Sequence, residues 1–142
     1  MFQIEDVLIP ARFICYILQV LLTISCAFEY EDFIDSTIEG NSQDEKNVMI
    51  RYWIILSLFF LFEIFEFIIL LSGYTLFIEL LSVVQIFFHS VAVLILNWFY
   101  RDAWNSELIW VPFLLGGVIP GLLEIYNLII LCSSNRVITK IK

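Results

Sequence analysis

Four long stretches of apolar residues alternate with shorter polar segments along the chain. They cover residues 7–28, 48–72, 74–100 and 108–132, and each is long enough to cross about 30 Å of hydrocarbon as a helix. They lack the alternating pattern and the roughly ten-residue length of strands in a membrane barrel. The pattern therefore predicts an all-α membrane protein in which four transmembrane helices form a bundle, a single four-span domain over residues 1–142.

The first apolar stretch has a second interpretation, as a cleaved signal peptide. Ser25, Cys26 and Ala27 resemble a cleavage site between small residues. However, Pro10 interrupts the start of the stretch, and two acidic residues precede it. Because a signal peptide begins with a basic segment, these features favour a first span that is retained.

The polar connections carry most of the charge. Residues 29–47 form an acidic loop with seven Asp or Glu residues and one lysine, whereas the tail after Cys132 carries three basic residues and no acid. Basic residues flanking the spans favour, by four to three, both termini in the cytoplasm and the acidic loop outside. All four tryptophans lie at span ends on the predicted outer side, as in an aromatic belt at one membrane interface. They are Trp53, Trp98, Trp104 and Trp110.

Composition excludes several classes of protein. Hydrophobic residues make up 61% of the 142 residues, whereas a soluble domain is usually about 45–50% apolar. So short a chain, folded as a globule, could not hide that much apolar surface from water. The net charge of −8 opposes binding to nucleic-acid phosphates. We therefore expect the lipid bilayer as the surrounding medium, no nucleic-acid partner and no ordinary soluble enzyme.

Charged side chains inside the apolar stretches are costly, so each requires an explanation. Counted at about 1.5 Å per residue from the predicted cytoplasmic ends, Arg12 and four glutamates gather in the inner half of the membrane. The glutamates are Glu63, Glu66, Glu79 and Glu124. We expect Arg12 to pair with one or more of the last three. One arginine cannot neutralise four carboxylates, so the unpaired ones are expected to be protonated, to reach the surface, or to face a partner chain.

The third span also carries a stripe of uncharged polar residues. At 100° per residue they fall on one face of a helix, and the same counting places His89 in the outer half, away from the glutamates. The stripe consists of Ser82, Gln85, His89 and Asn97.

Three interpretations of these polar groups remain open. They hold the helices together, they form a proton or cation site like that of a small coupled transporter, or they contact another membrane subunit. The first is favoured because interhelical polar contacts are common in membrane bundles. The single histidine excludes a metal centre built on several histidines. Because the sequence also offers no hydrolase or redox motif, we expect neither catalysis nor a cofactor.

The fourth span is interrupted by glycines and a proline. Pro120 cannot donate a hydrogen bond to the carbonyl of Gly116, so we expect a kink there. Gly117 and Gly121 are four residues apart and allow another helix to approach closely. Packing within the chain is favoured over a dimer interface.

Several of these positions together resemble the transmembrane protein 107 family. The segment Ile9–Phe13 is similar to the Pro-x-Arg-Phe entry of that family into its first span. The resemblance continues at Glu66, Leu71, Ser72, Gly73 and Phe77. From Gly73 onward the matches fall at the family's spacing without gaps, and they include His89, Trp104, Trp110, Pro120 and Glu124. The loop over residues 29–47 shows no match, and neither do Glu63 and Glu79.

The resemblance implies a non-enzymatic role at the base of cilia. Proteins of that family belong to the Meckel syndrome module of the ciliary transition zone, which supports ciliogenesis and forms a diffusion barrier controlling ciliary membrane composition. The implied partners are tectonics, other small multispan proteins, and cytosolic proteins with B9 and C2 domains. The alternative is a small proton- or cation-coupled transporter or channel that uses the intramembrane glutamates.

Overall fold

Eight helical segments, four of them long, make up the described part of the chain. The computed structural model describes residues 5–35, 37, 42–73, 79–102 and 105–140. Among these residues every regular element is helical, and the helices long and apolar enough to cross a membrane number four. The predicted all-α class and the four membrane helices are therefore confirmed. The membrane-crossing segments are Val7–Phe28, Glu45–Ser72, Glu79–Arg101 and Ser106–Ser133.

The first three crossings are continuous helices. They are α1 (Glu5–Phe28), α3 (Ser42–Ser72) and α4 (Glu79–Arg101), with the short α2 (Tyr30–Asp35) between α1 and α3. Helix α3 ends at Ser72, and the φ of 74° at the following Gly73 suits a residue without a side chain just past a helix terminus. Residues 74–78, where the third span was predicted to begin, lie outside the described residues.

The fourth crossing is built from shorter pieces that follow one another without a break. They are the 3-10 helix η1 (Ser106–Ile109), α5 (Trp110–Phe113), the π-helical turn η2 (Leu114–Val118) and α6 (Ile119–Lys140). The π turn ends at Val118, two residues before Pro120, as expected where a proline disrupts helical hydrogen bonding.

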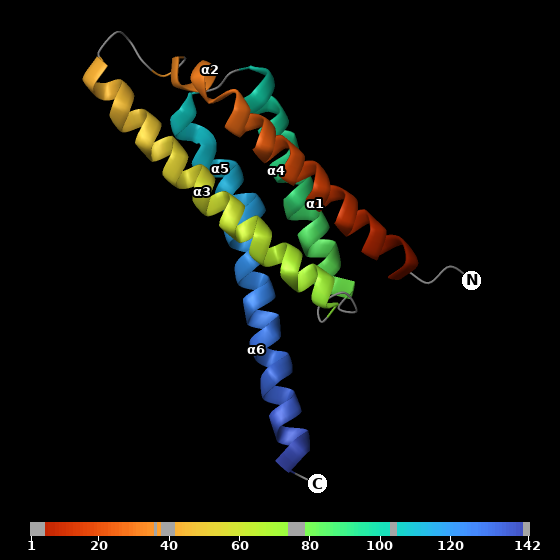
Figure 1. Cartoon of the computed structure of the whole chain (residues 1–142). Coiled ribbons are helices and arrows are strands. Elements are labelled where there is room, and N and C mark those ends of the chain that lie inside the picture. Colours follow the sequence, from red (N-terminus) through yellow and green to blue (C-terminus); the bar gives the residue numbers. More distant parts are fainter. Residues whose placement is uncertain (1–4, 36, 38–41, 74–78, 103–104, 141–142) are drawn as a thin grey trace.

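The long helices pack as a bundle with two distinct ends (Figure 1). The start of α1 and the end of α6 lie at one end, which we call the terminal end, as an even number of crossings requires. Helices α2 and η1 lie at the other, which we call the α2 end. Helix α6 extends beyond the other helices at the terminal end. Which end faces the cytoplasm remains a prediction.

An aromatic and aliphatic cluster fills the bundle near the α2 end. The rings of Phe33 and Phe99 are 4.6 Å apart between centroids, and the Tyr52 hydroxyl donates a hydrogen bond of 2.9 Å to the carbonyl of Cys26. These contacts connect α2, α4, α3 and α1. The buried members are Cys26, Phe33, Tyr52, Leu56, Phe59, Leu96, Phe99 and Ile109.

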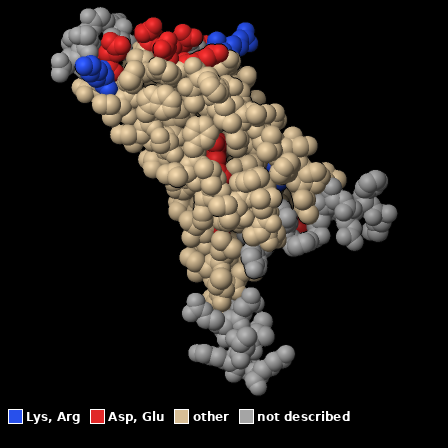
Figure 2. All heavy atoms as spheres, in the orientation of Figure 1, with Lys and Arg blue, Asp and Glu red and all other residues tan. Residues whose placement is uncertain are grey.

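Large apolar side chains cover the outside of the bundle between the two ends. Figure 2 shows this surface as a broad tan face, with acidic side chains gathered at the α2 end. A protein surrounded by water would expose few such contiguous patches, so the surface is suited to lipid. Examples of the exposed residues are Leu61, Ile68, Leu71, Leu80, Phe87, Leu94, Tyr126 and Ile129.

Candidate functional site

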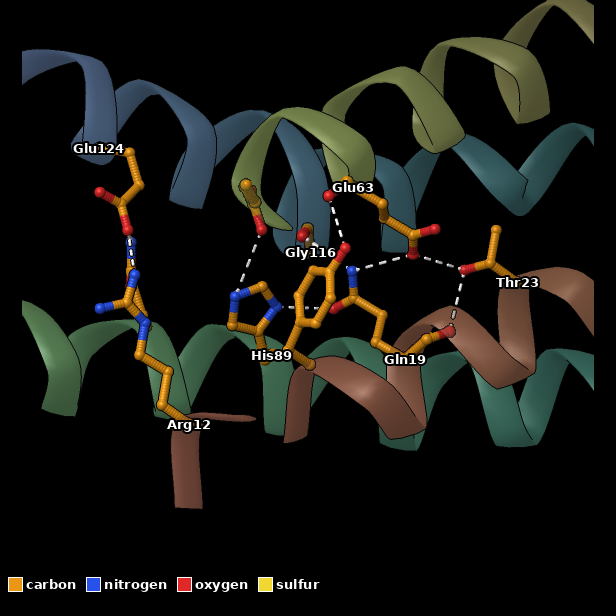
Figure 3. A network of polar contacts seen from close by, with 10 residues as sticks. Arg12, Gln19, Thr23, Glu63, His89, Gly116 and Glu124 are labelled. Atoms are coloured by element: carbon orange, nitrogen blue, oxygen red, sulfur yellow. Dashed lines mark hydrogen bonds and ion pairs between the residues drawn. The ribbon is translucent and has the colours of Figure 1, made fainter. Parts of the chain in front are cut away.

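Nine polar side chains meet between the four long helices, on the terminal side of the aromatic cluster. Figure 3 shows several of them, among them Arg12, Glu63 and His89. Each of the nine is less than 5% exposed, in a protein whose outside is suited to hydrocarbon. We call this group the polar core. It consists of Arg12, Gln19, Thr23, Glu63, Glu66, Ser82, Gln85, His89 and Glu124.

An ion pair occupies the part of the polar core nearest the terminal end. Arg12 Nη2 contacts Glu124 Oε1, and Gln85 Nε2 donates a hydrogen bond of 2.7 Å to the same oxygen. The three residues come from α1, α6 and α4. A buried charge is tolerated when it is paired and hydrogen-bonded, so this contact fixes three helices to one another.

A second contact compensates for Pro120. Because proline has no N–H, the carbonyl of Gly116 loses its usual helical donor. Gln19 of α1 replaces that donor, with its Nε2 lying 2.9 Å from the Gly116 oxygen. A Cβ atom at position 116 would lie only 2.6 Å from both Ala92 Cβ and Gln19 Oε1. Glycine at this position therefore permits α1 and α4 to pack closely against η2.

The same amide orients the histidine. Since Gln19 Nε2 donates to the Gly116 carbonyl, Gln19 Oε1 is the acceptor, and it lies 2.9 Å from His89 Nδ1. His89 Nδ1 therefore carries a hydrogen. The other ring nitrogen, Nε2, lies 3.4 Å from Glu66 Oε2. A neutral Nε2 is an acceptor, so a proton on either His89 Nε2 or Glu66 makes this contact favourable.

Glu63 lies on the α2 side of this group. Its Oε1 accepts hydrogen bonds from Thr23 Oγ1 at 2.8 Å and from Gln19 Nε2 at 3.3 Å. The hydroxyl of Tyr16 donates to the main-chain carbonyl of Glu63. Thus Tyr16, Gln19 and Thr23 bond to Glu63 from one neighbouring helix, α1.

The structure places the predicted charged residues as follows. Arg12 meets Glu124, and Glu66 and Glu63 lie in the same polar core. Glu79, in contrast, is exposed in the first turn of α4. It contributes nothing to the polar core.

The predicted depth of His89 is wrong. The histidine lies beside Glu66 and not in a region away from the glutamates. Counting about 1.5 Å per residue along each span gives a depth within that span only. The level at which α4 packs beside its neighbours decides that His89 meets Glu66.

The predicted place of Asn97 in one stripe with Ser82, Gln85 and His89 is also wrong. Ser82, Gln85 and His89 are buried as one stripe, but Asn97 is exposed. The buried face of α4 continues instead through Ala92, Leu96 and Phe99. Because Asn97 follows Leu96 directly, it is rotated by about 100° from the buried face.

Sequence reasoning missed the residues that α1 contributes. Tyr16, Gln19 and Thr23 are buried together with Arg12 and Cys26. Their spacing of 4, 3, 4 and 3 residues is that of one face of a helix. This pattern could have identified them, because polar residues at helical spacing from a buried arginine share its face.

The glycines and tryptophans have clear positions. A Cβ atom on Gly121 would lie 2.9 Å from the Phe62 ring, and one on Gly117 would lie 3.4 Å from Phe62 Cβ, so both glycines pack within the chain. The described tryptophans are exposed toward the α2 end, whereas Trp104 lies outside the described residues. The exposed ones are Trp53, Trp98 and Trp110.

Four apolar helices around a buried polar core define a small integral membrane protein. The sequence model of the TMEM107 family, described as a transmembrane protein, matches residues 8–128. The chain therefore belongs to this family, and the match includes every residue of the polar core. No curated protein and no solved structure matches the chain.

Proposed function

We propose that the chain is a non-enzymatic scaffold subunit of the membrane complex at the ciliary transition zone. In this role it contributes to cilium assembly and to the diffusion barrier that controls ciliary membrane composition. The observation that carries the proposal is the family match over residues 8–128, which covers most of the chain.

The arrangement of the polar core supports a structural role. Arg12, Gln19 and Glu124 connect different helices to one another. These contacts serve to fix the helix positions, and a rigid bundle presents constant lateral surfaces to other membrane subunits. Partners of the tectonic type and other small multispan proteins are proposed to contact these surfaces.

The two ends of the bundle offer different surfaces to soluble domains. The α2 end exposes acidic side chains from α2 and the following loops, whereas a basic tail follows the fourth span. We assign the terminal end to the cytosolic partners with B9 and C2 domains. The described exposed acids at the α2 end are Glu29, Glu31, Asp32, Asp35, Glu45, Asp102 and Glu107.

Localisation in ciliated cells tests the proposal. A tagged chain is expected as a ring at the ciliary base, and its removal is expected to let excluded membrane proteins enter the cilium. A diffuse signal in the plasma membrane or the endoplasmic reticulum would contradict the proposal. So would proton or cation flux in liposomes that Glu63→Gln or Glu66→Gln abolishes, since that result belongs to a transporter.

A further inference from the structure

A groove between α1 and α3 opens on the lipid-facing side of the bundle. Its volume is about 220 Å³, and its walls are apolar and aromatic. Tyr16 and Val20 line it from α1, and Phe60, Ile64 and Phe67 line it from α3. Glu63 also lines it and is its one charged residue. The groove is therefore an apolar slot with a single carboxyl group at its base.

Only one of the two oxygens of that carboxyl group is hydrogen-bonded within the described part of the chain. Glu63 Oε1 accepts bonds from Thr23 and Gln19, but Oε2 has no hydrogen-bond partner, although the residue is 1% exposed. Figure 3 shows Oε2 directed away from both of these partners. A buried carboxyl oxygen without a partner is costly in a low-dielectric environment. Since Glu63 lines the groove, Oε2 is the carboxyl oxygen available to a molecule seated there.

The depth of Glu63 decides what kind of molecule fits. It is nine residues from the end of α3 at Ser72, or about 13 Å into the membrane. A lipid carries its hydrogen-bonding groups at the headgroup and offers only an acyl chain at this depth. A transmembrane helix presents polar side chains at any depth, and such groups bond across helices.

We infer that this groove seats a transmembrane helix of another membrane subunit, with an amide or hydroxyl side chain of that helix bonded to Glu63. Asn, Gln, Ser and Thr suit the site because each can both donate and accept, and so each matches the carboxyl in either protonation state. The inference rests on the proposed scaffold function, and it specifies the surface and the chemistry of the partner.

A second groove supplies a matched control. It lies between α3 and α6, has a volume of about 240 Å³, and is lined by Leu61, Phe62, Phe65 and Ile125. It contains no carboxyl group. Ile64 and Leu61 are three residues apart on α3 and are 56% and 61% exposed, and each lines one of the two grooves.

Site-specific photocrosslinking of the full chain in ciliated cells tests the inference. A photoreactive amino acid is placed at position 64 or, as the control, at position 61. Position 64 is expected to give an adduct with a transmembrane segment that carries Asn, Gln, Ser or Thr near the crosslink, and position 61 only lipid adducts. Glu63→Leu is expected to lower the position-64 adduct about tenfold, as the loss of one interhelical polar contact implies. Glu63→Gln is expected to retain it.

A second variant guards against misfolding of Glu63→Leu. Val20→Trp fills the groove from its wall without altering a polar residue, and it too is expected to abolish the position-64 adduct. Lipid adducts at position 64, a crosslinked segment without a polar residue, or an adduct that survives Val20→Trp would overturn the inference. If the chain is absent from the ciliary base but the helix adduct forms, the proposed function fails while this inference stands.

Discussion

The polar core and the α2 end both join the helices through polar contacts, but in different surroundings. In the polar core the Arg12–Glu124 pair is almost fully buried, with side chains 4% and 0% exposed. At the α2 end, Arg51 Nη2 lies 3.1 Å from Glu107 Oε1, and these side chains are 63% and 55% exposed. An Arg–Glu pair thus occurs both inside the bundle and at its charged end.

The difference teaches which contacts hold the fold. When a buried charge loses its partner, no water is present to solvate the charge. When an exposed charge loses its partner, water solvates it instead. Some hydrogen bonds at the α2 end also lie at the surface. One of them runs from the Tyr30 hydroxyl to the Glu31 carboxylate, and it raises the pKa of Tyr30. The polar core is therefore expected to be the more sensitive region, and substitutions test this in order of effect.

The largest effect is expected from breaking the buried pair. Arg12→Leu is expected to lower the free energy of unfolding by about 3–5 kcal/mol, because it leaves Glu124 buried without its cation. Titration with a denaturing detergent measures the change. The double variant Arg12→Leu/Glu124→Leu is expected to recover most of the loss. A loss in the double variant equal to the sum of the two single-variant losses would mean that the pair is not a unit.

The next effect concerns the amide that compensates for Pro120. Gln19→Leu is expected to cost about 1–3 kcal/mol, because the Gly116 carbonyl then has no donor. In a Pro120→Ala background, the alanine supplies the missing N–H, so the cost of Gln19→Leu is expected to be smaller by about 1 kcal/mol. A double-mutant cycle measures this coupling. Strict additivity would contradict the assigned role of Gln19.

At the α2 end, Thr37 is the most connected hydroxyl. It donates to the carbonyl of Phe33 at 2.8 Å, and it accepts from the backbone N–H of Ser106 at 2.8 Å. Thr37→Val is expected to cost about 1 kcal/mol. The matched control is Ser25→Ala, which removes a bond within one helix only. A loss as large as that of Arg12→Leu would remove the contrast between the two regions.

The smallest effect is expected for the exposed pair. Glu107→Gln is expected to change stability by less than about 1 kcal/mol, and the change is expected to vanish at high salt, because both partners are hydrated and screened. Unfolding measured at low and high ionic strength checks this. A large, salt-independent loss would show that Arg51 and Glu107 are held in a drier environment than their exposure indicates.

Much of the fold could be predicted from the sequence. The four crossings follow from runs of apolar residues, because the transfer of a segment into hydrocarbon depends mainly on its own composition. The freed carbonyl at Gly116 was equally predictable, since a missing N–H at Pro120 is a covalent property. The exposure of Asn97 was not predictable, because Asn97 is rotated by about 100° from Leu96 and only the packing of the neighbouring helices decides how wide the buried face of α4 is.

The sequence by itself determined that this chain crosses a membrane four times and that one arginine and several glutamates must share its interior. Only the tertiary structure decided that Glu124 receives Arg12, that Gln19 replaces the donor missing at Pro120, and that His89 lies beside Glu66. The physical reason is that hydrophobic burial acts on each segment separately. Polar pairing instead depends on where each helix begins and how far it is shifted along its neighbours, and a shift of one turn, about 5.4 Å, changes every partner.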